Sequence, residues 1–233
     1  MLWGIRPVEQ QAAYGLAVEG LRRQIHIGLI MPGERLPAER QLAEKLEVSR
    51  VTLREALRIL ETEGYLTVRR GVAGGAFVVS EDELRSLVLR RIGRDPAAIM
   101  RAFEFLSVNA RIAARFAAVR RTPSHLRIMR RAADDMEHAD SPSLLRRAET
   151  LLQMTVAEAT QNVLLAHAIE EAWAATFAPK PSGGVETERQ VSREIATELV
   201  NAIDERNEDR AEPAMVCTLD RDSKQISSIR RSR

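Results

Sequence analysis

Two groups of arginines carry the clearest chemical signal in this sequence. Arg50, Arg54 and Arg58 recur every fourth residue, so a helix would place them on one face. Arg69 and Arg70 stand directly before the glycine-rich stretch GVAGG. A guanidinium can bind guanine O6 and N7 in bidentate fashion or hold a phosphate, which is the chemistry of nucleic-acid recognition. Taken singly, each group also fits a plain alternative, a solvated helix face with local ion pairs or an ordinary surface hairpin.

The glycine-rich stretch does not match a nucleotide-binding loop. A P-loop requires GxxxxGK[ST], and no lysine follows these glycines. A dinucleotide-binding loop requires GxGxxG between a strand and a helix, whereas here the spacing is GxxGG and a second strand-like segment follows. The sequence also shows no nucleophile–base pair and no metal-binding motif. We therefore expect no enzymatic activity.

The elements that must position these arginines follow from the apolar pattern of the first eighty residues. Residues 8–29 have helical spacing, Pro37 can open a short second helix, and Ser49 is a good N-cap for a third. The β-branched and aromatic segments 65–68 and 76–79 flank the glycine-rich loop, as in a hairpin. This order of elements predicts a winged helix-turn-helix, whose third helix enters the DNA major groove.

Composition narrows the class of protein without deciding its partner. The 233 residues are 45% hydrophobic and 29% charged, with a net charge of +2, so bulk charge argues neither for nor against nucleic acid. Cys217 is the only cysteine, which excludes a disulfide framework or a cysteine metal cluster. No apolar run approaches the roughly 20 residues of a membrane span. We expect a cytoplasmic protein with no membrane partner.

The stretch PGERLPAERQLAEKLEVSRVTLREALRILETEGYLTVRRGVAGGAFV resembles the DNA-binding domain of GntR-family bacterial transcription regulators, without a gap over nearly fifty residues. In that family the wing glycine, here Gly71, lies against the minor groove. Glu39 and Glu55 face the same region, and we interpret them as residues that orient the arginines. The resemblance implies that double-stranded DNA is contacted by Arg40, Ser49, Arg50, Thr52, Arg54, Arg70 and Gly71.

The rest of the chain has an almost wholly helical pattern, which predicts a bundle of about six helices. We expect a DNA-binding domain at 1–80, a polar hinge at 81–84, a helical effector-binding and dimerisation domain at 85–221, and a disordered basic tail at 222–233. The predicted fold class is mainly α, with an N-terminal winged helix-turn-helix and a C-terminal antiparallel helical bundle.

The second half resembles the all-helical effector domain of the FadR branch of the family, through FEF, ARFAAVRRT, ETLLQMTVAEATQNVLL and AIDERNEDRAEPAM. Most such domains hold a metal with an aspartate, a histidine four residues later and two further histidines. The aligned positions here are Glu149, Gln153, Ala196 and Thr218, which are poor metal ligands or none, and Leu106 lies near the position of the family's effector-binding arginine. The histidines of this chain show no ligand spacing. We therefore expect no metal and no other cofactor.

Four polar residues are candidates for an effector pocket: Asn109, Glu149, Gln153 and Asn162. A buried polar group requires a partner, and an effector larger or more apolar than a small carboxylate is one such partner. The alternative is that these side chains bond one another or the backbone.

Together these features predict a ligand-responsive bacterial transcription regulator that binds a short palindromic operator as a homodimer. The alternative is a DNA-binding regulator without a small-molecule effector, controlled by a protein partner or by its own concentration.

Overall fold

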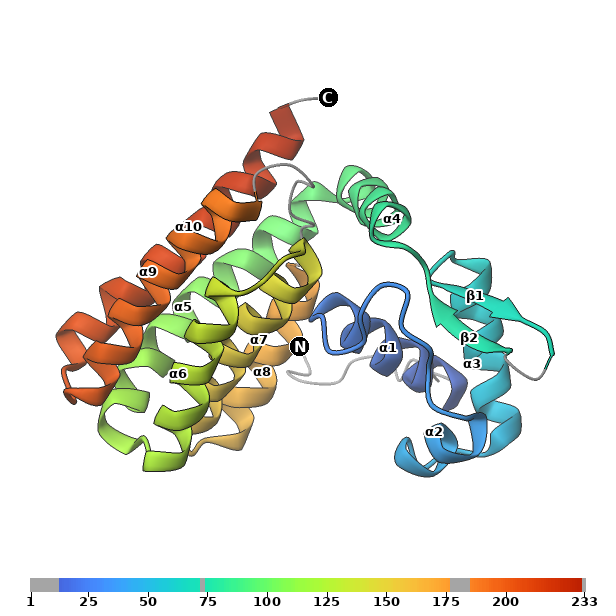
Figure 1. Cartoon of the computed structure of the whole chain (residues 1–233), viewed down its shortest axis with the longest axis horizontal. Helices are drawn as coiled ribbons and strands as arrows, with labels where there is room; N and C mark the ends of the chain where they lie inside the picture. Colours follow the sequence, from blue (N-terminus) through green and yellow to red (C-terminus); the bar gives the residue numbers. More distant parts are fainter. Residues whose placement is uncertain (1–12, 72–73, 177–184, 232–233) are drawn as a thin grey trace, which may run out of the picture.

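A computed structural model of the chain describes residues 13–71, 74–176 and 185–231. It has a small head with the N-terminal helices and the two strands, and a larger helical bundle beside it (Figure 1). One helix, α4, follows the second strand and leads from the head to the bundle (Figure 1).

The head has the predicted order of elements. It consists of α1 (Ala13–His26), α2 (Glu39–Lys45), α3 (Arg50–Thr62), β1 (Leu66–Arg69) and β2 (Gly75–Val78). The two strands pair antiparallel from Leu66↔Val78 to Arg69↔Gly75. The prediction of a winged helix-turn-helix is confirmed.

Local chemistry explains where α3 begins and which way it faces. The Ser49 side chain accepts a hydrogen bond from the Thr52 backbone N–H at 3.0 Å, which satisfies one of the free N–H groups of the first turn. Leu53, Leu57 and Leu60, spaced four and three apart, are buried against the rest of the head. The opposite face of α3 therefore points to solvent and carries its arginines.

Residues 81–84, expected to be a polar hinge, instead form the first turn of α4 (Glu81–Arg94). Ser80 and Glu83 form a capping box, in which each side chain bonds the other residue's backbone N–H. Leu84 is buried, which ties this first turn to the core. The polar run that suggested a hinge is thus a helix start signal.

The bundle contains the six helices α5 (Pro96–Arg120), α6 (Pro123–Glu137), α7 (Pro142–Ala159), α8 (Val163–Ala175), α9 (Val185–Asp204) and α10 (Glu208–Arg231). Helix α5 lies against α7, α8 and α10, and its buried face is rich in alanine, which lets neighbouring helices approach closely. No helix among the described residues is long and apolar enough to cross a membrane.

The basic tail, residues 222–233, was expected to be disordered, whereas the structure describes it as helical as far as Arg231. Helix α10 continues without a break to that residue, because no proline or glycine interrupts the chain after Pro213. Residues 232–233 lie outside the described part of the chain.

Candidate DNA interface and effector region

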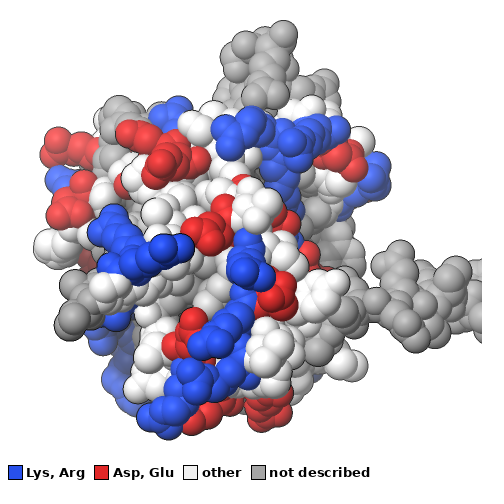
Figure 2. Space-filling view, turned by 90° about the vertical axis from the view of Figure 1, so that its right-hand side faces the viewer, with Lys and Arg blue, Asp and Glu red and all other residues white. Residues whose placement is uncertain are grey.

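The arginines of α3 lie on an exposed surface of the head. Figure 2 shows that basic side chains run across this side of the molecule, with acidic side chains between them. Arg50 and Arg54 are both exposed, and Arg50 forms no ion pair with any described residue. A free guanidinium near the N-terminal end of a recognition helix is suited to contact a base edge or a phosphate.

Arg54 is held in place by a residue of the neighbouring helix. Its Nε atom donates to Glu39 Oε2 at 2.8 Å, so a carboxylate of α2 orients the side chain from α3. The interpretation of Glu39 as an orienting residue is therefore confirmed in this geometry. Glu55 differs, because its carboxylate pairs with Arg58 at 3.4 Å and not with a predicted DNA-contacting arginine.

The other residues predicted to contact DNA from α2 and α3 have ion-pair or hydrogen-bond partners close by in the sequence. Arg40 pairs with Glu44 at 2.8 Å one turn along α2. The hydroxyls of Ser49 and Thr52 lie 2.8 Å apart, so Ser49 serves as the helix cap and shares its hydroxyl with Thr52. Exposed pairs of this kind are weak and can be exchanged for a phosphate at little cost.

The wing lies beside α3 and shares a groove with it. A groove of about 690 Å³ runs between α3 and the hairpin, and both Arg54 and Arg69 line it. Arg69 stacks on the Phe77 ring at 4.5 Å, whereas Arg70 is exposed and has no partner among the described residues. Gly71 has a φ of +105° and open space around it, so its backbone can approach another molecule closely.

Sequence reasoning missed one cation of this groove, Arg35. A Cβ added to Gly75 would lie 2.8 Å from the Nε atom of Arg35, so the glycine makes room for the arginine side chain beside the wing. The placement depends on a backbone bridge between Arg35 and Phe77, which are far apart in the sequence. No local pattern could have shown it.

A second site lies inside the bundle. The four positions aligned with the metal ligands, Glu149, Gln153, Ala196 and Thr218, line one cavity of about 30 Å³, together with Ser192. Glu149 Oε1 accepts from the Ser192 hydroxyl at 2.9 Å. The four positions aligned with the family's metal ligands therefore lie together in the structure, as the alignment requires.

The comparisons with known proteins identify a family for each half of the chain. Residues 13–78 match the family described as "Bacterial regulatory proteins, gntR family", and residues 110–221 match the FCD domain. The chain belongs to the GntR family. It pairs the family's DNA-binding domain with an FCD domain, which confirms the resemblance of both halves.

Several relatives support this assignment. The chain is 34% identical over 151 residues to the Uxu operon transcriptional regulator of Escherichia coli, a match that covers 61% of this chain and 56% of that protein. It is 33% identical over 171 residues to the Exu regulon transcriptional regulator of the same organism, covering 71% and 63%. The matches thus span less than two thirds of either relative. The fold is also that of E. coli McbR/YncC, with a TM-score of 0.52 at 19% identity over 93% of this chain and 98% of that one.

The bundle cavity does not fit the metal that the FCD resemblance implies. Glu149 is the only carboxylate at the four positions, and Ala196 offers no donor atom. Within the described residues no group of three or more histidines, cysteines or carboxylates is placed to hold a metal ion. Three imidazoles cannot be replaced by an amide and a hydroxyl, because these neutral oxygens bind transition metals weakly.

Gln153 shows how polar this cavity remains. Its side chain is 4% exposed, and its amide Nε2 donates to Thr218 Oγ1 at 3.2 Å. Thr218 donates its own proton to the Met215 carbonyl at 2.6 Å, so its oxygen must accept, which fixes the amide orientation. Gln153 Oε1 is then a buried acceptor that bonds no described residue. A volume near 30 Å³ suits a water molecule with this acceptor, and the expected larger effector does not fit it.

Two of the four predicted effector residues, Asn109 and Asn162, do not line this cavity. Asn109 directly precedes Ala110, which is buried, and neighbouring residues of a helix point in different directions. The Asn109 amide therefore points away from the core and donates to the Phe105 carbonyl at 2.7 Å. Asn162 is the N-cap of α8, where its Oδ1 accepts from Leu165 N–H at 3.2 Å. Leu106 is fully buried in the core.

Proposed function

We propose that this GntR-family chain is a ligand-responsive transcription regulator that binds a short palindromic operator as a homodimer. Its DNA-binding domain would be residues 1–80 and its effector and dimerisation domain residues 85–221. The observation that carries the proposal is the exposed pair Arg50 and Arg54 on α3, beside a wing that shares the groove with Arg54. Operator binding also assigns the protein to the bacterial cytoplasm, where the chromosome lies.

The two arginines suit different parts of the contact. Arg54 uses its Nε atom for Glu39, so its terminal nitrogens remain available for a guanine edge or a phosphate. Arg50 has no competing carboxylate among the described residues and can bind a phosphate without first breaking an ion pair. Arg70 and Gly71 on the wing would then reach the adjacent minor groove.

A homodimer is supported by an apolar stripe on the bundle. Phe105, Val108, Ile112 and Val119 are spaced three, four and seven residues apart on α5 and are between 45% and 57% exposed. A stripe of this kind on a helix favours burial against another protein surface, and two-fold pairing makes it self-complementary. Two heads related by a two-fold axis would read a palindrome, which doubles the short site that one head can read.

A specific observation favours the second candidate, a regulator without a small-molecule effector in the bundle. The cavity at the FCD metal positions holds about 30 Å³, far below the volume of a usual ligand site. In that case a protein partner or the concentration of the regulator itself would control operator occupancy.

The test begins with selection of binding sites from random duplex DNA by the full-length protein. Gel-shift titration on the selected operator then compares wild type with Arg50→Ala and Arg54→Ala, which should each weaken binding by about 1–3 kcal/mol. Arg127→Ala is the matched control, because Arg127 is an exposed arginine on α6. Thermal melts of all variants should agree closely. Selection without any enriched sequence, or equal affinities for all variants, would contradict the proposal.

A second measurement separates the two candidate functions. Native mass spectrometry of the purified protein shows whether it retains a small molecule, and melting temperatures show whether that molecule binds the folded state. A retained compound that raises the melting temperature favours ligand response. A protein that carries none, but whose operator occupancy follows its own concentration, favours the alternative.

A further inference from the structure

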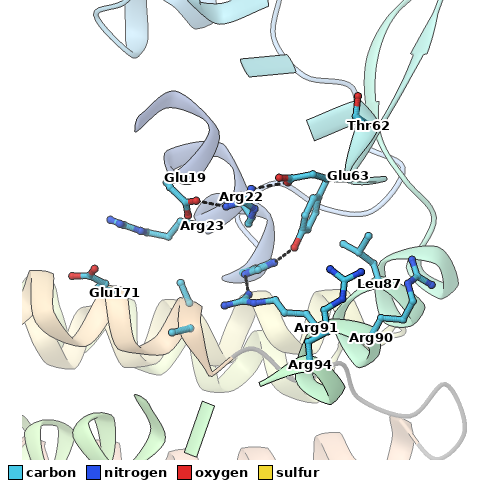
Figure 3. A pocket seen from close by; sticks show the side chains of 14 residues that line it. Glu19, Arg22, Arg23, Thr62, Glu63, Leu87, Arg90, Arg91, Arg94 and Glu171 are labelled. Atoms are coloured by element: carbon cyan, nitrogen blue, oxygen red, sulfur yellow. Dashed lines mark hydrogen bonds and ion pairs between the residues drawn. The ribbon is translucent and has the colours of Figure 1, made fainter. Parts of the chain in front are cut away.

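A cleft lies where the head meets the bundle, and it shares no lining residue with the bundle cavity. It has a volume of about 680 Å³ and is lined by side chains of α1, α4 and α8 together with the segment that ends α3 (Figure 3). We propose that this cleft is a binding site for a small polyanion, an organic molecule that carries at least two carboxylate or phosphate groups.

Charge is the first argument. Five arginines line the cleft against three glutamates: Arg22, Arg23, Arg90, Arg91 and Arg94 against Glu19, Glu63 and Glu171. Arg22 alone binds two of these carboxylates, Glu63 at 2.6 Å and Glu19 on its own helix (Figure 3). The remaining four guanidiniums face one carboxylate, Glu171. The cleft therefore has an excess of positive charge that its own side chains do not neutralise.

The free arginines are concentrated on one helix. Arg90 and Arg94 are one turn apart on α4, and neither forms an ion pair with a described residue. Like charges at this spacing destabilise a helix, and an anion bound between them would remove that repulsion. Arg23, on α1, also has no acidic partner in the described ranges.

Arg91 is held in position by His26, an uncharged side chain that cannot neutralise its charge. Its Nη1 lies 2.9 Å from His26 Nδ1, and the other ring nitrogen of His26 lies 2.9 Å from the Tyr65 hydroxyl. Burial, together with the charges of Arg91 and Arg22, lowers the pKa of His26 to about 3. The imidazole is therefore neutral and accepts the hydrogen bond from Arg91 through Nδ1. This frame holds a guanidinium at the cleft without a counter-charge.

Size and chemistry agree on the kind of ligand. A volume near 680 Å³ lies in the usual range for small-molecule sites, in contrast to the 30 Å³ of the bundle cavity. Guanidiniums bind carboxylates and phosphates in bidentate geometry, so several of them select a ligand with more than one anionic group.

The position of the cleft links it to regulation, a step that rests on the proposed function. Arg23 belongs to the head, Arg90 and Arg94 to the connecting helix α4, and Glu171 to the bundle. An anion that bridges these elements favours one orientation of the head relative to the bundle. Because coupling between two sites is reciprocal, operator binding and anion binding would alter each other's affinity.

The site is tested on the full chain without DNA. Calorimetric titration uses citrate as the polycarboxylate and pyrophosphate as the phosphate, with acetate at equal ionic strength as the monovalent control. We expect saturable binding of citrate or pyrophosphate, and whichever binds more tightly identifies the anionic group. The double variant Arg90→Gln with Arg94→Gln should raise the apparent Kd at least about tenfold, the loss that one charge-assisted hydrogen bond accounts for.

The matched control removes the same charge elsewhere. Arg101→Gln with Arg127→Gln changes two exposed arginines of α5 and α6 outside the cleft and should leave anion binding at the wild-type value. Arg23→Gln tests the cleft from α1, independently of α4. Equal weakening by cleft and control variants, or no saturable binding of either probe, would overturn the proposal.

Operator titration with and without the bound probe then examines the coupling. A probe that binds the cleft and shifts operator affinity in wild type, but not in the α4 double variant, supports the regulatory step. Loss of operator affinity in the α4 variant when neither probe binds would mean that these arginines serve DNA phosphates, and would overturn the anion site. Failure to bind any DNA overturns the proposed function but leaves the calorimetric result standing.

Discussion

Acidification should destabilise this protein through one buried histidine, His26. The side chain is 2% exposed, and its ring nitrogens contact Arg91 and Tyr65. Its pKa is lowered to about 3 in the folded state, first by burial and then by the positive charges of Arg91 and Arg22. In the unfolded chain the pKa of a histidine is about 6.5.

The sign of the effect follows from proton binding. Between pH 6.5 and pH 3 the unfolded chain binds a proton at this residue and the folded chain does not, so the free energy of unfolding rises with pH across this window. The stabilisation is complete above the unfolded pKa and is lost as the pH falls, at about 1.4 kcal/mol per pH unit. Lowering the pH from 7 to 5 should therefore cost about 2 kcal/mol, a large share of the stability of an ordinary domain.

The assay is urea unfolding of wild type and His26→Gln at a series of pH values from 7 to 5. Glutamine keeps a donor and an acceptor but does not titrate, so the difference in unfolding free energy between the two proteins should change by about 2 kcal/mol over this range. Tyr65→Phe is the control, because it removes one hydrogen bond of His26 and keeps the imidazole. Parallel pH profiles for wild type and His26→Gln would refute the assignment of a neutral, buried imidazole.

Three further outcomes are expected. Operator affinity should fall steeply with salt, by about 10³–10⁵-fold between 50 and 200 mM if the paired heads make six to ten phosphate contacts, and a flat log–log plot would exclude docking led by arginines. Val108→Glu on the α5 stripe should convert a dimer into a species of 26.1 kDa in light scattering, whereas a wild-type monomer at micromolar concentration, with and without operator, would exclude the homodimer. Elemental analysis after dialysis should find no stoichiometric zinc or nickel, and a retained metal that disappears in Glu149→Ala would show that the bundle cavity is a metal site after all.

Local features of the head were predictable because they depend on neighbours within one turn of chain. Ser49 caps α3 through the N–H three residues on, and the leucines spaced four and three apart assign one face of that helix to the core. The exposure of Arg50 and Arg54 then follows from the helical period alone. The same local rules place Ser80 and Glu83 in a capping box at the expected hinge, and they make Asn162 the N-cap of α8.

Contacts between distant segments could be decided only by the tertiary structure. Arg54 and Glu39 are fifteen residues apart on two helices, and their ion pair depends on how α2 crosses α3. The bundle cavity gathers residues from five helices, α6 to α10, and its small volume results from side-chain packing that no spacing encodes. The arginine-lined cleft is the strongest case, since Arg23 and Arg91 come to line one cleft only when the head packs beside α4 and α8. Helical periodicity specifies which face of an element is buried, but the partner of that face is chosen by packing over the whole chain.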